Sequence, residues 1–249
     1  QIIKENKKYL SGVKAERVFD EIEKAISLSS KPALFFRILD ELDLLEVHFP
    51  YIKQMQGIPQ PPKYHPEGSV FEHSLQTLNE MARFTDSNEL LFASLLHDIG
   101  KIDTPQNILP SHYKHHNSGL KTIKKVYNKI DLPNSYKKVT EEGIRLHGKL
   151  HHIQDMRIGS LYDLLIESDK SRIGFDGLIK LHLADKRGRN SKNDNYSFPY
   201  TAQELKDYVN KMQNAINGKS IELPNNRKAK AILKNKRCQW MRFNPIKNG

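Results

Sequence analysis

Residues 95–101 read Leu-Leu-His-Asp-Ile-Gly-Lys, and this stretch decides the expected fold and site. An apolar helix leads directly into His97 and Asp98, and Gly100 then reads as a C-cap that ends the helix before Lys101. Imidazole and carboxylate groups are the ligands that mid-row divalent metal ions prefer. Adjacent helical residues diverge by about 100°, but they can share one ion when they lie at a helix end that faces a cleft.

Outward from this stretch, apolar residues recur at helical spacing almost throughout the chain. Proline-rich or polar segments at 57–68, 101–116 and 187–199 predict loops, and no segment alternates in the manner of a strand. The sequence therefore predicts an all-α fold, a helical bundle with an N-terminal helical extension and a basic tail. The predicted helices span residues 15–28, 33–45, 70–84, 88–99, 118–130, 134–147, 158–169, 173–186 and 201–216.

Further potential metal ligands stand at the ends of other predicted helices. A single histidine at a helix end is more often a cap or a surface residue than a ligand. An ordered set in an all-helical chain is more informative, because a helical bundle can gather ligands from several helices around its core. The set comprises His73, His97, Asp98, His115, His116, His147 and Asp185.

This order resembles that of the HD superfamily of metal-dependent phosphohydrolases. More closely, residues 12–217 resemble the C-terminal part of bacterial tRNA nucleotidyltransferases (CCA-adding enzymes) that carry an HD domain. The matching stretches are residues 15–18 (Ala-Glu-Arg-Val), 49–50 with 63–67, 97–105, His115 with Gly119, 146–147 and 184–189.

The resemblance implies a role for each site residue. His73, His97, Asp98 and Asp185 would hold one divalent ion, and His115 and His147 would add ligands if a second ion binds. The ion is Mn, Ni, Co, Fe, Mg or Zn, since histidine-rich ligand sets accept several of them. Asp98 and Lys101 are the expected catalytic residues. The expected phosphate-binding residues are Lys101, Arg187, Arg189, His116 and His151.

The basic side chains among these residues also have a purely structural interpretation. Lys101 suits the C-terminal end of a helix dipole, and Arg187 and Arg189 read equally well as ordinary loop charges.

The implied activity is hydrolysis of 2′,3′-cyclic phosphates, 2′-nucleotides or phosphomonoesters, in nucleotides or at RNA 3′ ends such as that of tRNA. The nucleotidyltransferase head of CCA-adding enzymes, with its Gly-Ser turn and paired carboxylates, has no match in the sequence. One alternative is therefore a tRNA-binding body without chemistry of its own. Another is hydrolysis of (d)NTPs or signalling nucleotides.

Three regions are expected: an N-terminal helical segment at 1–66, the HD phosphohydrolase domain at 67–217 and a basic tail at 218–249. The tail places six basic residues beside Trp240 and Phe243, a composition that suits RNA backbone contact and base stacking. The alternative is a terminal amphipathic helix that docks through Ile232 and Leu233. The basic residues are Arg227, Lys228, Lys230, Lys234, Lys236 and Arg237.

The net charge is +11 and the sequence pI is about 9.5, which favours polyanions such as nucleic acid, or else reflects a solubilising lysine coat. No apolar run approaches the roughly 18 residues of a membrane helix. The one cysteine, Cys238, excludes an internal disulfide. With no apolar leader after Gln1, these features predict a cytoplasmic protein without a membrane partner.

Overall fold

The computed structural model describes residues 6–189, 196–217 and 227–246. Within these ranges the chain is helical, with no strand and one isolated antiparallel bridge between Pro59 and Ser69. The predicted all-α fold is therefore confirmed. None of the helices in the described ranges is both long enough and apolar enough to cross a membrane.

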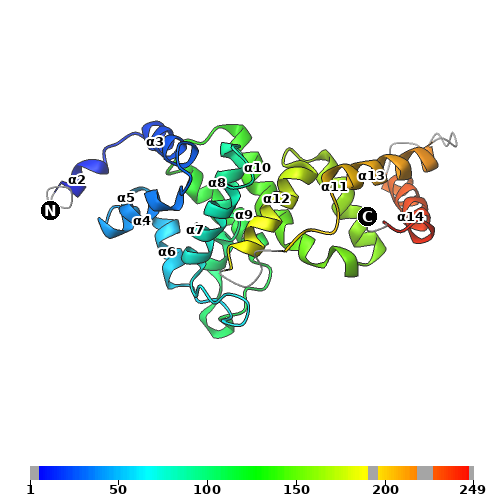
Figure 1. Ribbon diagram of the computed structural model, residues 1–249, viewed down its shortest axis with the longest axis horizontal. Helices are drawn as coiled ribbons and strands as arrows, with labels where there is room; N and C mark the ends of the chain where they lie inside the picture. Colours follow the sequence, from blue (N-terminus) through cyan, green and yellow to red (C-terminus); the bar gives the residue numbers. More distant parts are fainter. Residues whose placement is uncertain (1–5, 190–195, 218–226, 247–249) are drawn as a thin grey trace.

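The molecule is elongated, with its N-terminal helices at one end and its last two helices at the other (Figure 1). The N-terminal end packs around Ile22, Phe36 and Ile52, all of which are buried. Its helices are α2 (Lys7–Leu10), α3 (Ala15–Ser27), α4 (Ala33–Glu41), α5 (Leu45–His48), α6 (Pro50–Gln54) and the 3₁₀ helix η1 (Met55–Gly57).

The predicted helix over 33–45 is wrong at its end. Helix α4 stops at Glu41, and Asp43 adopts a left-handed backbone conformation with φ of 58°. A short polar side chain tolerates that conformation better than most non-glycine residues. A second helix, α5, then begins at Leu45 in a new direction.

The middle of the molecule is a bundle around α8 (Asn88–Leu96). Every residue of α8 from Leu90 to Leu96 is buried, as expected for a helix that is apolar on all sides. Ser87 begins it by accepting a hydrogen bond from the Leu90 amide. The helices that pack on α8 include α7 (Val70–Met81), α10 (Asn134–Leu146) and α12 (Gly174–Arg187), while α9 (His115–Tyr127) packs on α10.

The segment after α8 corrects two expectations. The helix ends at Leu96, and residues predicted as loop form the 3₁₀ helices η2 (Ile99–Asp103) and η3 (Gln106–Ile108). Gly100 is not a left-handed C-cap, since it lies inside η2 without a positive φ. A Cβ at residue 100 would lie 1.9 Å from the His115 carbonyl oxygen, so glycine is required where η2 meets the start of α9.

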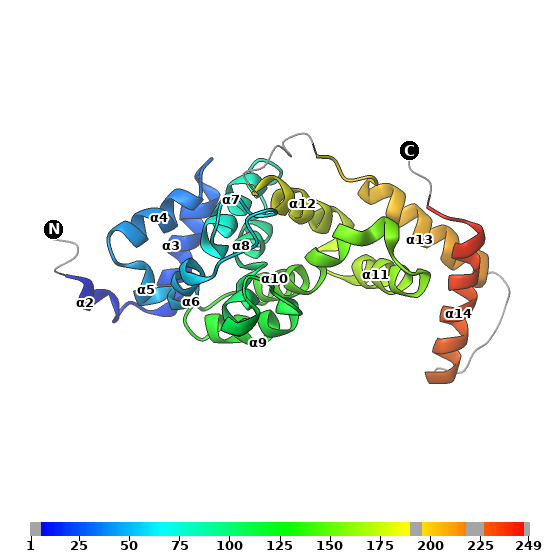
Figure 2. The ribbon, with the colours of Figure 1, turned by 90° about the horizontal axis from the view of Figure 1, so that it is seen from below.

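The C-terminal end contains the 3₁₀ segment η4 (His147–Asp155) and the helices α11 (Ile158–Lys170), α13 (Ala202–Asn217) and α14 (Arg227–Phe243). In Figure 2, α14 crosses α13 at the end of the molecule furthest from α3. Helix α14 docks through Met241, which is 1% exposed, with help from Cys238 and Trp240. The alternative interpretation placed Ile232 and Leu233 at the docking contact, but Ile232 is 38% exposed and neither residue packs against the core. Residues 190–195 of the predicted loop and 218–226 of the tail lie outside the described ranges.

Candidate metal centre

Asp98 lies at the end of α8, where four histidines surround its carboxylate. Its Oδ2 is 3.2 Å from Nε2 of His97 and 3.7 Å from Nε2 of His73. Its Oδ1 is 3.2 Å from Nε2 of His115 and 3.4 Å from Nε2 of His147. The expected ligands from α7, α8, α9 and the end of α10 therefore meet at one carboxylate.

A second carboxylate, that of Asp185, reaches the same place from α12. Its Oδ1 lies 3.0 Å from Nε2 of His73, and its Oδ2 lies 2.9 Å from Nε2 of His151. Arg189 lies four residues after Asp185 and donates to its carboxylate, with Nη2 at 2.8 Å and 2.9 Å from the two oxygens. Asp98 and Asp185 are each only 2% exposed.

The backbone fixes which ring nitrogen of three histidines carries the proton. Nδ1 of His97 is 2.7 Å from the Ser94 carbonyl, and Nδ1 of His115 is 2.9 Å from the His112 carbonyl. Nδ1 of His147 is 3.0 Å from the Gly143 carbonyl. Because a carbonyl oxygen can only accept, each Nδ1 donates, and each neutral ring presents the lone pair of Nε2 to Asp98.

The convergence of these lone pairs on carboxylate oxygens fits a divalent cation. Acceptor atoms that face acceptor atoms at 3.2–3.4 Å repel unless a cation or proton lies between them. Nε2 of His97 and Oδ1 of Asp98 are both buried without a hydrogen-bond partner. Two groups with ligand atoms within 4.8 Å of one another share Asp98, one with His73 and His97, the other with His115 and His147.

Two cations border the carboxylates. Nζ of Lys101 lies 2.6 Å from Oδ2 of Asp98 and donates to Oε1 of Gln60 at 2.6 Å. Burial alone raises the pKa of Asp98, but the charge of Lys101 outweighs burial and holds that pKa well below its usual range. Burial likewise raises the pKa of Asp185, and the charge of Arg189 reverses the shift and lowers it. Both aspartates are therefore ionised, as metal ligands must be.

A cavity of about 400 Å³ opens onto this group. The residues that line it include Asp98, Asp185, Lys101 and Arg189, together with His115, His147 and His151. This volume lies within the range of small-ligand sites. The cavity therefore brings two carboxylates and two cations within reach of a small ligand.

The model of the family described as "HD domain" matches residues 70–189, which include the expected ligands from His73 to Asp185. Residues 70–189 form an HD domain. Residues 1–56 match a second family model, described as "Probable RNA and SrmB- binding site of polymerase A". The expected resemblance to the HD superfamily is thus confirmed.

Curated relatives extend the similarity beyond the HD domain. The chain is 32% identical over 204 residues to the Multifunctional CCA protein of Mannheimia succiniciproducens, covering 79% of this chain and 47% of that protein. It is 34% identical over 240 residues to the Multifunctional CCA protein of Thioalkalivibrio sulfidiphilus, covering 90% and 57%. The chain therefore spans about half the length of the curated relatives it matches.

Three residues of the HD domain's site come from the proline-rich loop and were assigned to no site from the sequence. Oε1 of Glu67 lies 2.9 Å from Nδ1 of His73 and 2.8 Å from Nδ1 of His65. Burial raises the pKa of Glu67, but its bonds to the two histidines outweigh burial and lower it to about 2. Burial lowers the pKa of His65 to about 4. Glu67 is therefore an anion that orients His73, while Gln60 holds Lys101.

We expect Glu67→Ala to weaken metal binding by about 10- to 100-fold, because carboxylates bonded to a ligand histidine fix its tautomer and raise its basicity. Competition with a chromophoric chelator for Co or Zn measures the change. Glu72→Ala is the matched control, since Glu72 is nearby but pairs with Arg37 at 2.6 Å on the surface. Equal affinity in the two variants would show that Glu67 does not orient a metal ligand.

Two expected phosphate-binding residues are not brought to the cavity of the HD domain. The Arg187 guanidinium lies 4.9 Å from the Phe84 ring centroid and donates to the Tyr196 carbonyl. His116 is the second residue of α9, next to His115, with 6.1 Å between the ring centroids, and does not line the cavity. Lys101, Arg189 and His151 do line it.

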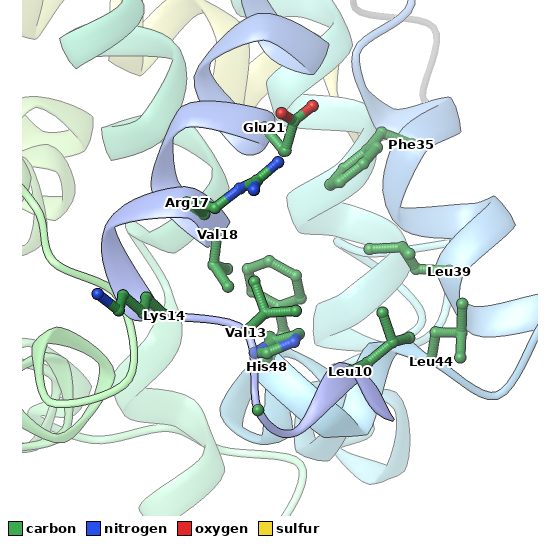
Figure 3. Close-up of a pocket in the computed structure, with 12 residues that line it drawn as sticks. Leu10, Val13, Lys14, Arg17, Val18, Glu21, Phe35, Leu39, Leu44 and His48 are labelled. Atoms are coloured by element: carbon green, nitrogen blue, oxygen red, sulfur yellow. The ribbon is translucent and has the colours of Figure 1, made fainter. Parts of the chain in front are cut away.

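A larger cavity, of about 800 Å³, lies outside the HD domain, against α3, α4 and α5. Figure 3 shows apolar side chains, including those of Leu10, Val13 and Leu39, around this cavity. It contains no group of side chains that could hold a metal ion. Of these two cavities, only the one at Asp98 is lined by the expected metal ligands.

Proposed function

We propose that this chain is a metal-dependent phosphohydrolase that acts on nucleotides or RNA 3′ ends. The observation that carries the proposal is the convergence of histidine Nε2 atoms on the buried carboxylates of Asp98 and Asp185. We infer that His73, His97, Asp98 and Asp185 hold one ion, and that His115 and His147 with Asp98 can hold a second.

A divalent ion bound there lowers the pKa of water and offsets charge on a phosphate oxygen. The neighbouring cations supply further stabilisation, since Lys101 and Arg189 line the cavity and can donate to phosphate oxygens. Asp98 is expected both as a ligand and as a catalytic residue, and the catalytic role open to an aspartate here is that of a proton acceptor. Its lowered pKa favours the first role, because a carboxylate of such low basicity accepts a proton poorly near neutral pH.

Three observations support a nucleotide or RNA substrate. The net charge of +11 favours polyanions. Residues 1–56 match a model described as a probable RNA-binding site. The curated relatives are named Multifunctional CCA proteins. We therefore infer a substrate with a 2′,3′-cyclic phosphate, a 2′-phosphate or another phosphomonoester, carried by a nucleotide or an RNA 3′ end such as that of tRNA.

The test is hydrolysis of 2′,3′-cyclic AMP, 2′-AMP and p-nitrophenyl phosphate by chelator-treated protein, reloaded separately with Mg, Mn, Co, Ni, Fe or Zn. We expect no turnover in the stripped protein and restored turnover with at least one metal. Product analysis shows which ester bond of the cyclic phosphate is cleaved. Absence of turnover with every metal, in protein that has taken up the metal, would refute the proposal.

A second candidate is an RNA-binding body whose metal site plays no catalytic part. The match of residues 1–56 and the exposed basic residues of α14, such as Lys230 and Lys236, favour it. It predicts tRNA binding that weakens steeply with salt, because phosphate contacts release counterions. Salt-dependent tRNA binding that is the same in stripped and reloaded protein, without hydrolysis, would favour this candidate.

A further inference from the structure

Two tyrosine rings stand in solvent at the mouth of the metal-site cavity. Tyr113 is 80% exposed and Tyr64 is 58% exposed, and both line the same cavity as Asp98. Among the described residues, the only other tyrosine that is mostly exposed is Tyr9 in α2. Two of three exposed tyrosine rings thus border the one cavity that holds the expected ligands and cations.

The backbones that carry these rings are tied together. His112 bridges the two loops, since its Nε2 donates to the Pro59 carbonyl at 3.0 Å. Its Nδ1 then accepts from the Thr104 hydroxyl at 2.8 Å. On the other loop, the Tyr64 amide donates to the Pro61 carbonyl at 3.0 Å. The mouth is therefore preorganised, so that little backbone entropy is lost when a ligand binds between the loops.

Two prolines, Pro61 and Pro110, line the cavity together with the tyrosines and the exposed Ser111. The charged residues that line it, by contrast, are buried or half-buried. The Lys63 ammonium lies 5.4 Å from the Tyr64 ring centroid, which places a cation beside a stacking surface. A ligand that suits this cavity has a phosphate at one end and a flat aromatic group at the other.

We propose that Tyr64 and Tyr113 stack on the nucleobase of the substrate, while Lys101 and Arg189 hold its phosphate. Base–aromatic stacking is a common means of holding an unpaired nucleotide, and it tolerates any base. The substrate is then a nucleotide or an RNA end with an unstacked terminal base, and not a simple phosphomonoester. This inference rests on the proposed phosphohydrolase function and adds base recognition to it.

The test compares 2′-AMP with glycerol 2-phosphate, a secondary phosphomonoester that lacks a base. We expect the metal-loaded protein to prefer 2′-AMP in kcat/KM. Tyr113→Ala and Tyr64→Ala should each lower this preference by about 5- to 100-fold, chiefly through KM, as loss of one stacking partner does. Tyr113→Phe and Tyr64→Phe keep the ring and should restore it. Tyr9→Ala is the matched control, because Tyr9 is 67% exposed beside Lys8 but far from the cavity.

The outcomes separate this inference from the function it rests on. Hydrolysis of both substrates without preference, or an equal loss on both in the alanine variants, overturns base stacking and leaves the phosphohydrolase standing. If the protein hydrolyses neither substrate, the proposed function fails. Calorimetric binding of 2′-AMP then decides the inference, which survives only if the alanine variants bind 2′-AMP more weakly and the phenylalanine variants do not.

Discussion

Replacing Gly100 by alanine is expected to destabilise the protein by more than about 3 kcal/mol, beyond the usual cost of overpacking. The new Cβ would lie 1.9 Å from the His115 oxygen, 2.3 Å from the Gly119 nitrogen and 2.7 Å from the Gly119 Cα. All three are backbone atoms, which cannot escape by changing rotamer. Helix α9 would therefore have to move away from η2, and it would carry His115 away from Asp98.

Urea denaturation followed by circular dichroism measures this loss, and chelator competition measures the accompanying loss of metal affinity. Gly159→Ala is the matched control, since a Cβ at residue 159 in α11 meets nothing within 4 Å. That control should be neutral or stabilising by up to about 1 kcal/mol, because alanine is the better helix former. Equal denaturation midpoints for Gly100→Ala and the unaltered protein would contradict the close contact between η2 and α9.

Asp98→Asn is expected to abolish hydrolysis, with a loss on the order of 10²–10³-fold or more, because it removes a preorganised charge at the reacting centre. The substitution keeps the shape of the side chain. It leaves the Lys101 ammonium, 7% exposed, without its carboxylate. Unpairing a buried charge costs about 3–5 kcal/mol, so the free energy of unfolding should fall as well.

Asp163→Asn provides the control for the ion pair itself. Lys234 lies 2.6 Å from Asp163, the same separation as between Lys101 and Asp98, but the Asp163 side chain is 57% exposed. Such a surface pair contributes about 0–1 kcal/mol, and its loss should leave hydrolysis intact. Metal content, unfolding and turnover are measured on both variants. Substantial turnover by folded Asp98→Asn would remove Asp98 from the catalytic site.

The helices could be predicted wherever the periodicity of apolar residues is strong, but the helix ends and the segments that connect them could not. Helix α8 is apolar on all sides and ends within three residues of its expected end. The left-handed Asp43 and the glycine required at residue 100 depend on contacts across the fold. The spacing of apolar residues along the sequence does not report such contacts. Gly100 was recognised as special for the wrong reason, since close approach of a second backbone leaves the same sequence signal as a C-cap.

The sequence predicted which titratable side chains come together, but it did not predict the residues that hold them in place. His73, His97, Asp98, His115, His147 and Asp185 come together as expected. Glu67 and Gln60 were missed because they lie in a loop, whose course periodicity cannot trace. Helical spacing from Asp185 could have shown that Arg189, and not Arg187, lies beside that carboxylate. Arg189 follows Asp185 by four residues and shares its face, whereas Arg187 follows by two and projects to the opposite side.

The shared position of Asp98 has a thermodynamic consequence. Its two oxygens serve different histidine groups, Oδ2 facing His73 and His97, and Oδ1 facing His115 and His147. A cation bound at one histidine group draws electron density from the other Asp98 oxygen and repels a second cation. Binding of a cation at one group therefore weakens binding at the other. A metal titration should therefore show a strong first phase and a weaker second phase, and a substitution in either histidine group should alter both.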